Sequence, residues 1–86
     1  MGYNRPLMDR AEIDATLLRL LAEASGRDPA ATDLGASFEE LGLDSVARVE
    51  LLAQLEDTFG VHVPQEDAMH LNTGREVARY LRRQVS

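Results

Sequence analysis

The sequence predicts an all-α domain, a small bundle of three main helices and one short helix, with a long loop between the first two main helices. Two observations carry this prediction. Aliphatic residues recur at helical spacing in three separate segments, and no segment shows the apolar–polar alternation of a half-buried strand. At 86 residues, 44% of them hydrophobic, the chain can bury one small core and has no room for a second domain.

The chain is expected to begin with a flexible leader over residues 1–8, which lack periodicity, followed by a single domain over residues 9–86. Asp9 and Glu12 have the spacing of a capping box, in which each side chain accepts a hydrogen bond from the other residue's backbone N–H. Apolar residues then follow at helical spacing. The first helix is therefore expected at residues 10–24, ended by the serine and glycine that follow.

Residues 27–44 form a long connection for so small a domain. Proline, glycine and aspartate favour turns in it, and long connections in compact domains usually carry a function or a short element. Ser37 and Glu40 again have capping-box spacing. One helical turn is therefore expected from Phe38 to Leu41, with these two apolar side chains packed on the core.

The second main helix is expected from Ser45 or Val46 to Phe59, where a glycine ends it. At about 100° per residue, one face of this helix is a core stripe, formed by Leu51, Leu52, Leu55 and Phe59. The opposite face mixes apolar and acidic side chains, namely Val46, Val49, Glu50, Ala53, Glu56 and Asp57.

This mixed face predicts a docking surface for a partner with a basic rim, because apolar side chains there point away from the core and carboxylates surround them. From Glu39 to Asp67 there are eight acidic residues and one basic residue, Arg48. The alternative is that Val46 and Val49 pack under the long loop.

After the second helix, residues 61–63 are expected to be extended because a proline follows them. A short helix is expected at residues 65–70, with Glu66 and Asp67 in its first turn. Thr73 and Glu76 form a further capping-box pair, which starts the last main helix. Its core side is expected to consist of Val77, Ala78, Leu81 and Val85, and its four arginines are expected to face water.

The composition excludes several classes of function. A net charge of −6 opposes binding to nucleic-acid phosphates, and two phenylalanines, two tyrosines and no tryptophan disfavour a platform for stacking bases. There is no cysteine, and His62 and His70 lie outside any ligand spacing, so no metal site is expected. Without a membrane-span or signal-peptide pattern, a cytoplasmic monomer that binds neither nucleic acid nor membrane is expected.

Ser45 is the candidate for covalent chemistry. A serine at a helix start is ordinarily the N-cap, but Asp44 can supply the cap here, and Arg48 stands where a reciprocal acidic residue would be needed. A phosphodiester on Ser45 would lie at the positive end of the helix dipole. No histidine or lysine lies close in sequence to activate Ser45. It is therefore interpreted as a passive acceptor modified by another enzyme, and the chain itself is not expected to be an enzyme.

The six residues around this serine resemble the attachment motif of acyl carrier proteins, which reads leucine, glycine, any residue, aspartate, serine and an aliphatic residue; here they are Leu41-Gly42-Leu43-Asp44-Ser45-Val46. The resemblance continues through the second helix, Pro64 and the last helix, over roughly residues 13–83. It implies an acyl-carrier-like bundle. It also implies that 4′-phosphopantetheine from coenzyme A is attached to Ser45 and carries fatty acyl or polyketide intermediates as thioesters.

The resemblance implies two kinds of partner. A phosphopantetheinyl transferase, using magnesium, would modify Ser45, and acyltransferase- or ketosynthase-type enzymes with basic docking surfaces would receive the load. The expected docking residues are Val46, Arg48, Val49, Glu50, Ala53, Glu56 and Asp57.

Three residues depart from the family pattern. Val46 replaces a commoner leucine. Arg48 puts a positive charge into the acidic helix, where it would narrow the choice of partners or, because it leans towards the core side, reach back to the loop. Gly74 stands where the family usually has an aliphatic residue, so the last helix is expected to start later or to fray.

Two alternatives remain open at this stage. One is a peptidyl or aminoacyl carrier of a nonribosomal pathway. Such carriers more often have a second glycine where Leu43 stands, so Leu43 and the acidity favour an acyl load. The other, from a different class, is a helical interaction module without covalent chemistry. Both would use the exposed face of the second helix, but only a carrier needs Ser45.

Overall fold

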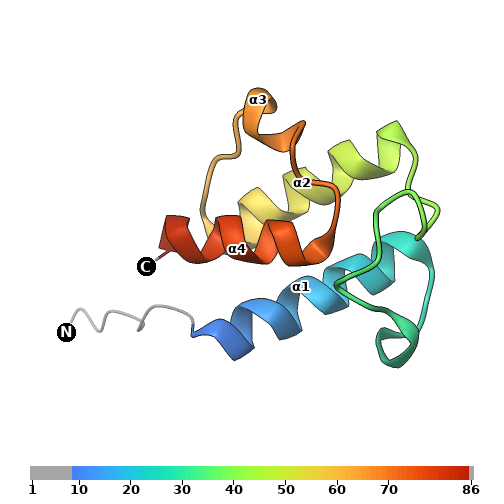
Figure 1. The fold of residues 1–86 in the computed structure, drawn as a ribbon. Coiled ribbons are helices and arrows are strands. Elements are labelled where there is room, and N and C mark those ends of the chain that lie inside the picture. Colours follow the sequence, from blue (N-terminus) through green and yellow to red (C-terminus); the bar gives the residue numbers. More distant parts are fainter. Residues whose placement is uncertain (1–8, 86) are drawn as a thin grey trace.

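The structure is a computed structural model that describes residues 9–85, so the leader expected at residues 1–8 lies outside the described residues. The predicted all-α fold is confirmed: three long helices and one short helix follow one another in the expected order (Figure 1). The elements are α1 (Arg10–Ser25), the 3₁₀ turn η1 (Pro29–Ala31), α2 (Ser45–Phe59), α3 (Gln65–Ala68) and α4 (Gly74–Val85).

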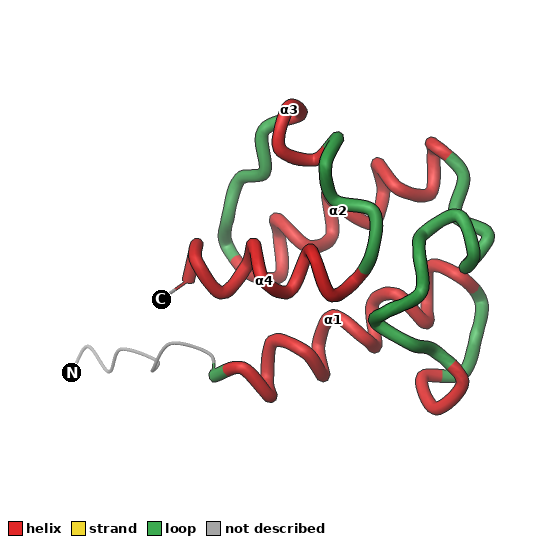
Figure 2. Tube along the Cα trace, in the orientation of Figure 1, coloured by secondary structure: helices red, strands yellow, loops and turns green. Residues whose placement is uncertain are grey.

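Helix α1 packs against both α2 and α4, so these three helices enclose the core. The short α3 lies on the side of α2 and α4 that is remote from α1 (Figure 2). The long loop between α1 and α2 covers the end of the bundle where α1 finishes and α2 begins. This loop leads directly into the residues expected to carry function.

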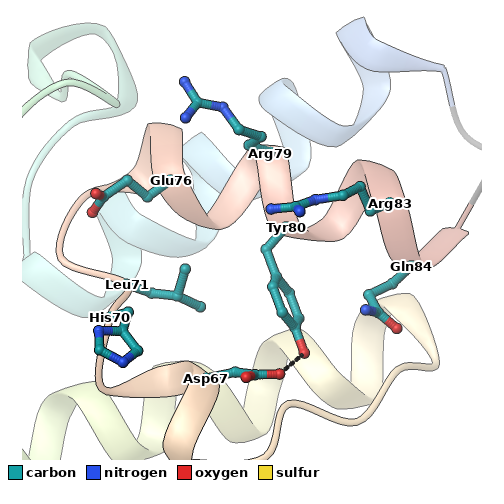
Figure 3. Close-up of a pocket in the computed structure, with 8 residues that line it drawn as sticks. All are labelled: Asp67, His70, Leu71, Glu76, Arg79, Tyr80, Arg83 and Gln84. Atoms are coloured by element: carbon teal, nitrogen blue, oxygen red, sulfur yellow. Dashed lines mark hydrogen bonds between the residues drawn. The ribbon is translucent and has the colours of Figure 1, made fainter.

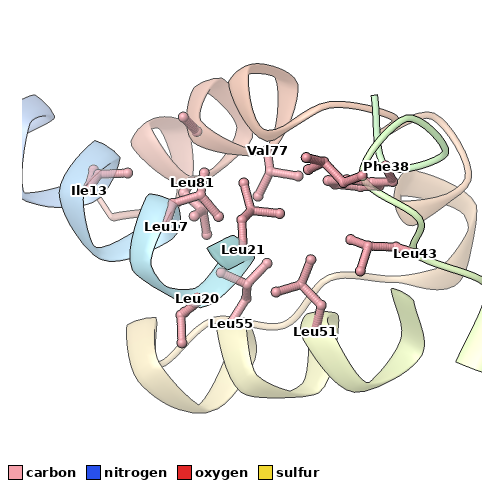
Figure 4. Packing of buried hydrophobic residues seen from close by; sticks show 12 residues of the cluster. Ile13, Leu17, Leu20, Leu21, Phe38, Leu43, Leu51, Leu55, Val77 and Leu81 are labelled. Carbon is pink, nitrogen blue, oxygen red and sulfur yellow. The ribbon is translucent and has the colours of Figure 1, made fainter. Parts of the chain in front are cut away.

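The core is built from the apolar faces predicted by helical spacing (Figure 4). Leu51 and Leu55 of α2 are buried, whereas Leu52 and Phe59 are half-buried and pack at its edge. The other buried members of this cluster are Ile13, Leu17, Leu20 and Leu21 of α1, Phe38, Leu41 and Leu43 of the loop, and Val77, Ala78 and Leu81 of α4.

The helix ends follow the capping signals in the sequence. The Asp9 carboxylate accepts a hydrogen bond from the Glu12 N–H at 2.8 Å, and the Glu12 carboxylate accepts one from the Asp9 N–H at 3.2 Å. At the start of α4, the Thr73 hydroxyl and the Glu76 carboxylate make the same reciprocal bonds, each 3.1 Å long. Helix α1 is one residue longer than expected, and α3 ends at Ala68 rather than at residue 70.

The single turn expected in the loop is confirmed. The Leu41 N–H donates to the Ser37 carbonyl at 3.0 Å, and Ser37 and Glu40 make the reciprocal capping-box bonds at 2.8 and 3.0 Å. One feature of the loop differs from the sequence-based expectation. The short element that the sequence did not predict is η1, which Asp28 caps. The expected inward placement of Phe38 and Leu41 is confirmed, because both are buried.

The loop is also tied to the segment before α4. Ser37 and Thr73 form an isolated antiparallel β-bridge, and the Phe38 N–H donates to the Asn72 carbonyl at 2.8 Å. The Arg75 N–H donates to the Leu34 carbonyl at 2.9 Å. These contacts join segments far apart in the sequence and fix the loop that precedes α2.

Gly74 is the first residue of α4 and is buried, so the expectation of a later or frayed start was wrong. The physical reason is a close approach of α1 and the loop to this backbone. A Cβ atom on Gly74 would lie 2.6 Å from Leu21 Cδ1 and 2.8 Å from Leu34 Cδ2. An aliphatic residue at this position has no room in the present packing.

We expect Gly74→Ala to destabilise the protein by about 1–3 kcal/mol, the range typical of overpacked cores, because the added methyl group must displace Leu21 and Leu34. Urea unfolding followed by circular dichroism measures the loss. Gly35→Ala is the matched control, since the nearest atom to its added Cβ is 3.4 Å away. Equal stability of the two variants would contradict the prediction.

Within residues 9–85, no helix combines the length and the apolar character needed to cross a membrane.

Candidate functional site

Ser45 is the first residue of α2, and its side chain is exposed. The predicted N-cap is confirmed to be Asp44, whose carboxylate accepts a hydrogen bond from the Ala47 N–H at 2.8 Å. Ser45 is therefore not the cap. Within the described part of the chain, neither its hydroxyl nor the backbone N–H groups of Ser45 and Val46 have a hydrogen-bond partner. The helix start thus presents one free hydroxyl beside two free N–H groups.

The residues before Ser45 hold it in this position. Leu41 and Leu43 are buried, so they anchor the loop on either side of Gly42. Gly42 has a φ of 79°, a left-handed conformation that residues with a Cβ atom rarely adopt. The Leu43 N–H donates to the Phe38 carbonyl at 2.9 Å. The chain then turns outward, which leaves Ser45 exposed next to a fixed loop.

Arg48 reaches back to this loop, which was one of the two roles that the sequence suggested for it. Its Nε–H donates to the Leu43 carbonyl at 3.3 Å, and its guanidinium carbon lies 5.7 Å from the centre of the Phe38 ring. The side chain is half-buried. Arg48 therefore connects the first turn of α2 to the loop that presents Ser45.

Val46 and Val49 are 67% and 66% exposed. The alternative that they pack under the long loop was therefore wrong. Ala53, Glu50 and Asp57 on the same helix are exposed as well. The structure thus leaves an apolar strip with carboxylates beside it on the outer side of α2, close to Ser45.

Glu56 was expected on the same docking surface, but its carboxylate contacts the protein itself. Glu56 Oε2 accepts a hydrogen bond from the Val63 N–H at 2.7 Å and lies 3.1 Å from His62 Nδ1. Glu56 is half-buried, whereas the His62 side chain is 82% exposed, in accord with the expected surface placement of this histidine. Val63 lies seven positions after Glu56, a spacing that no local sequence motif marks.

An open groove of about 750 Å³ runs from Ser45 along α2 to α3. More of the side chains that line it are apolar than polar. Among the polar ones, Ser45 and Arg48 belong to the first turn of α2, and Glu56 belongs to its last turn. The others are His62, Gln65 and Asn72. The apolar lining includes Phe38, Val49, Leu52, Ala53, Ala68, Met69 and Leu71. The groove depends on how α3 is placed over α2, so sequence reasoning did not find it.

A second depression, of about 450 Å³, lies between α3 and α4 (Figure 3). It is lined mainly by polar and charged side chains. The Tyr80 hydroxyl donates to the Asp67 carboxylate across it, at 2.8 Å. Among residues 9–85, no group of three or more side chains is arranged to hold a metal ion. The hydrogen bond between Tyr80 and Asp67 holds the short α3 against α4 at this depression.

We expect Tyr80→Phe to lower stability by about 0.5–1.5 kcal/mol near neutral pH, because one hydrogen bond between α3 and α4 is lost. Burial, and then the hydrogen bond to Asp67, raises the pKa of Tyr80 above its usual value. The folded protein therefore keeps a proton that the unfolded chain releases. The contribution of Tyr80 is present below about pH 10 and is lost as the pH rises through the folded-state pKa.

Urea unfolding of the wild type and Tyr80→Phe at neutral pH and near pH 11 checks this expectation. The stability difference between the two proteins should shrink at the higher pH. A difference that stays constant would show that the Tyr80 proton does not stabilise the fold.

Comparison with known proteins agrees with this geometry. Residues 15–81 match the family model described as "Phosphopantetheine attachment site". The chain is 39% identical over 84 residues to an acyl carrier protein of Streptomyces coelicolor, with 95% of this chain and 85% of the relative covered. An acyl carrier protein of Rhodococcus erythropolis is 36% identical over 73 residues, which cover 84% of this chain and 80% of the relative.

A third relative is the meromycolate extension acyl carrier protein of Mycolicibacterium smegmatis, 36% identical over 73 residues, with 84% of this chain and 74% of the relative covered. The family match spans most of the described helices, and the relatives share the same carrier designation. The chain therefore belongs to the acyl carrier protein family, whose members bear a covalently attached 4′-phosphopantetheine.

Proposed function

We propose that 4′-phosphopantetheine is attached to Ser45 and that the protein carries acyl or polyketide intermediates on it and presents them to partner enzymes. The observation that carries this proposal is the exposed, unpartnered Ser45 hydroxyl at the start of α2, where Asp44 has already taken the capping role. A serine needed only to cap the helix would have its hydroxyl engaged.

The residues at this site suit a phosphodiester. The free N–H groups of Ser45 and Val46 and the positive end of the α2 dipole favour an anion at the Ser45 oxygen. The bound group would supply a thiol for thioester formation, which the chain lacks because it has no cysteine. The carboxylate next to Ser45 in the sequence, that of Asp44, is engaged in capping the helix, and no side chain within residues 9–85 is hydrogen-bonded to the Ser45 hydroxyl. The base for the transfer therefore comes from a phosphopantetheinyl transferase.

The groove between α2 and α3 gives an acyl chain a place to lie. It begins at Ser45, and more of its lining side chains are apolar than polar. A chain bound there would be removed from water along part of its length, which stabilises it by about 25 cal/mol per Å² of buried apolar surface. The groove is open, so the chain can leave it when a partner enzyme binds.

Partner enzymes would dock on the outer side of α2, where Val46, Val49 and Ala53 offer apolar contact. Glu50 and Asp57 beside them would attract the basic rim of a transferase or of an acyltransferase- or ketosynthase-type enzyme. An acyl load is favoured over an aminoacyl load because the relatives are named acyl carrier proteins, one of them for meromycolate extension.

Incubation with coenzyme A, magnesium and a promiscuous phosphopantetheinyl transferase tests the proposal by intact-protein mass spectrometry. We expect a gain of one phosphopantetheine mass that is abolished in Ser45→Ala. Ser25→Ala, in α1, is the matched control and should keep the gain. If the wild type gains no mass under conditions that modify another carrier protein, the proposal is wrong and a non-covalent interaction module replaces it.

A further inference from the structure

Arg48 is the only arginine or lysine between Arg27 and Arg75 in the sequence, and it lies one turn after Ser45 on α2. Residues three apart on a helix are neighbours on its surface, and helical side chains lean towards the N-terminus. The hydrogen bond from Arg48 Nε to the Leu43 carbonyl shows that the side chain follows this direction. The guanidinium therefore lies at the level of the α2 start, and both Arg48 and Ser45 line the same groove.

The guanidinium still has donors to offer. Its Nε–H is used by Leu43, and its carbon lies over the Phe38 ring, so its position is fixed from two sides. Its terminal nitrogens have no acceptor and no carboxylate partner within residues 9–85. A half-buried arginine held in place with free N–H groups is suited to bind an oxyanion.

The charged residues near Ser45 in the sequence are predominantly acidic, so a nearby cation would stabilise an anion attached there. Asp44 and Glu50 flank Ser45 along the chain, and Glu39 and Glu40 lie in the loop before it. A phosphodiester attached to Ser45 would be repelled by these carboxylates. Arg48 is the one cationic side chain of α2 that can offset this repulsion.

We propose that Arg48 binds the phosphodiester of the phosphopantetheine attached to Ser45 and so restricts the root of the arm to the mouth of the groove. This inference rests on the proposed attachment at Ser45. Arg48 acts here as a positioning residue. From Ser45, the arm would run along the apolar wall of the groove rather than swing freely in solvent. This path favours entry of the load between α2 and α3.

The phosphodiester is a better occupant for Arg48 than a carboxylate on the load. The phosphodiester is bonded to the Ser45 oxygen and therefore always lies within one helical turn of Arg48. The load is at the far end of the arm. Its encounter with Arg48 would require the arm to fold back along its own path, at a cost in conformational entropy.

Phosphorus-31 NMR of the modified protein tests the proposal, with Arg48→Gln, Arg48→Lys and the α4 control Arg79→Gln prepared alongside the wild type. We expect the phosphorus resonance of the wild type and of Arg79→Gln to coincide. In Arg48→Gln, the phosphorus chemical shift should move towards the value measured in denaturant. In Arg48→Lys, it should lie between the wild-type value and the Arg48→Gln value. High salt should reduce the difference between wild type and Arg48→Gln, because exposed charge pairs are screened.

A second measurement separates this role from a structural one, because Arg48→Gln also loses the Leu43 and Phe38 contacts. The melting temperature of each protein is measured before and after modification. If Arg48 binds the phosphodiester, the rise on modification should be about 4 °C larger in the wild type than in Arg48→Gln. In the wild type itself, modification should shift the Arg48 Nε–H resonance, a result that does not depend on the folding of any variant.

Equal phosphorus shifts in Arg48→Gln and Arg79→Gln, with an unchanged Arg48 Nε–H resonance, would overturn the inference while leaving attachment at Ser45 intact. So would an Arg48 resonance that moves only when a malonyl group is loaded, because the bound anion would then be the load. Absence of any mass gain in the wild type is a different result, which refutes the proposed function itself.

Discussion

Replacing Leu55 with alanine is expected to destabilise the protein by about 2–5 kcal/mol, the usual loss for a fully buried leucine. Leu55 has no exposed surface and lies on the inner face of α2, in the core shared with α1 and α4. A domain of this size has a total stability of roughly 5–15 kcal/mol. The variant therefore loses a large fraction of its stability and should unfold at a lower temperature and a lower urea concentration than the wild type.

Thermal and urea unfolding measure this loss, and the matched control is Val49→Ala on the same helix. Val49 is 66% exposed, so its truncation should change stability by no more than about 0.5 kcal/mol. If Leu55→Ala were as stable as Val49→Ala, the face of α2 that carries Leu55 would not be the buried one, contrary to the structure.

Local signals were sufficient to predict the helices. The apolar spacing of α1, α2 and α4 and the capping pairs Asp9–Glu12 and Thr73–Glu76 depend on residues three or four apart, and the structure realises each of them. The Ser45 hydroxyl is left without a capping role for a local reason too, because the preceding residue, Asp44, caps the helix instead. Short-range physics decides all of these features.

The features that were missed depend on long-range contacts. Gly74 looked like a weak helix start, but α1 and the loop approach it too closely for a side chain. Glu56 looked like a free surface carboxylate, but the chain after α2 returns to it and supplies the Val63 N–H. The groove beside Ser45 arises only when α3 is placed over α2. No spacing within a single segment encodes these encounters.

Arg48 illustrates the boundary between the two cases. The sequence showed that its charge is unusual in an acidic helix and left two roles open for it. In the structure, Arg48 contacts the Leu43 carbonyl and the Phe38 ring, both of which belong to the loop before α2. Arg48, which the sequence suggested as a determinant of partner choice, thereby lies one helical turn from Ser45, the proposed attachment site.

Val49→Asp is expected to lower the kcat/KM of a phosphopantetheinyl transferase for the protein about tenfold or more, chiefly through KM. The exposed Val49 side chain lies at the centre of the apolar strip of α2, and a carboxylate there must be desolvated when a partner binds. A tenfold loss corresponds to about 1.4 kcal/mol, a modest value for one central contact residue.

Gln54→Asp is the control for Val49→Asp, because it adds the same charge to an exposed position of α2 that points in another direction. Stability of the two variants should be similar, so a loss of rate confined to Val49→Asp reports on docking. The wild-type rate should also fall with rising salt, because Glu50 and Asp57 act through long-range attraction. Equal rates for the two variants would place the docking surface elsewhere and leave the exposure of Val46 and Val49 without a functional explanation.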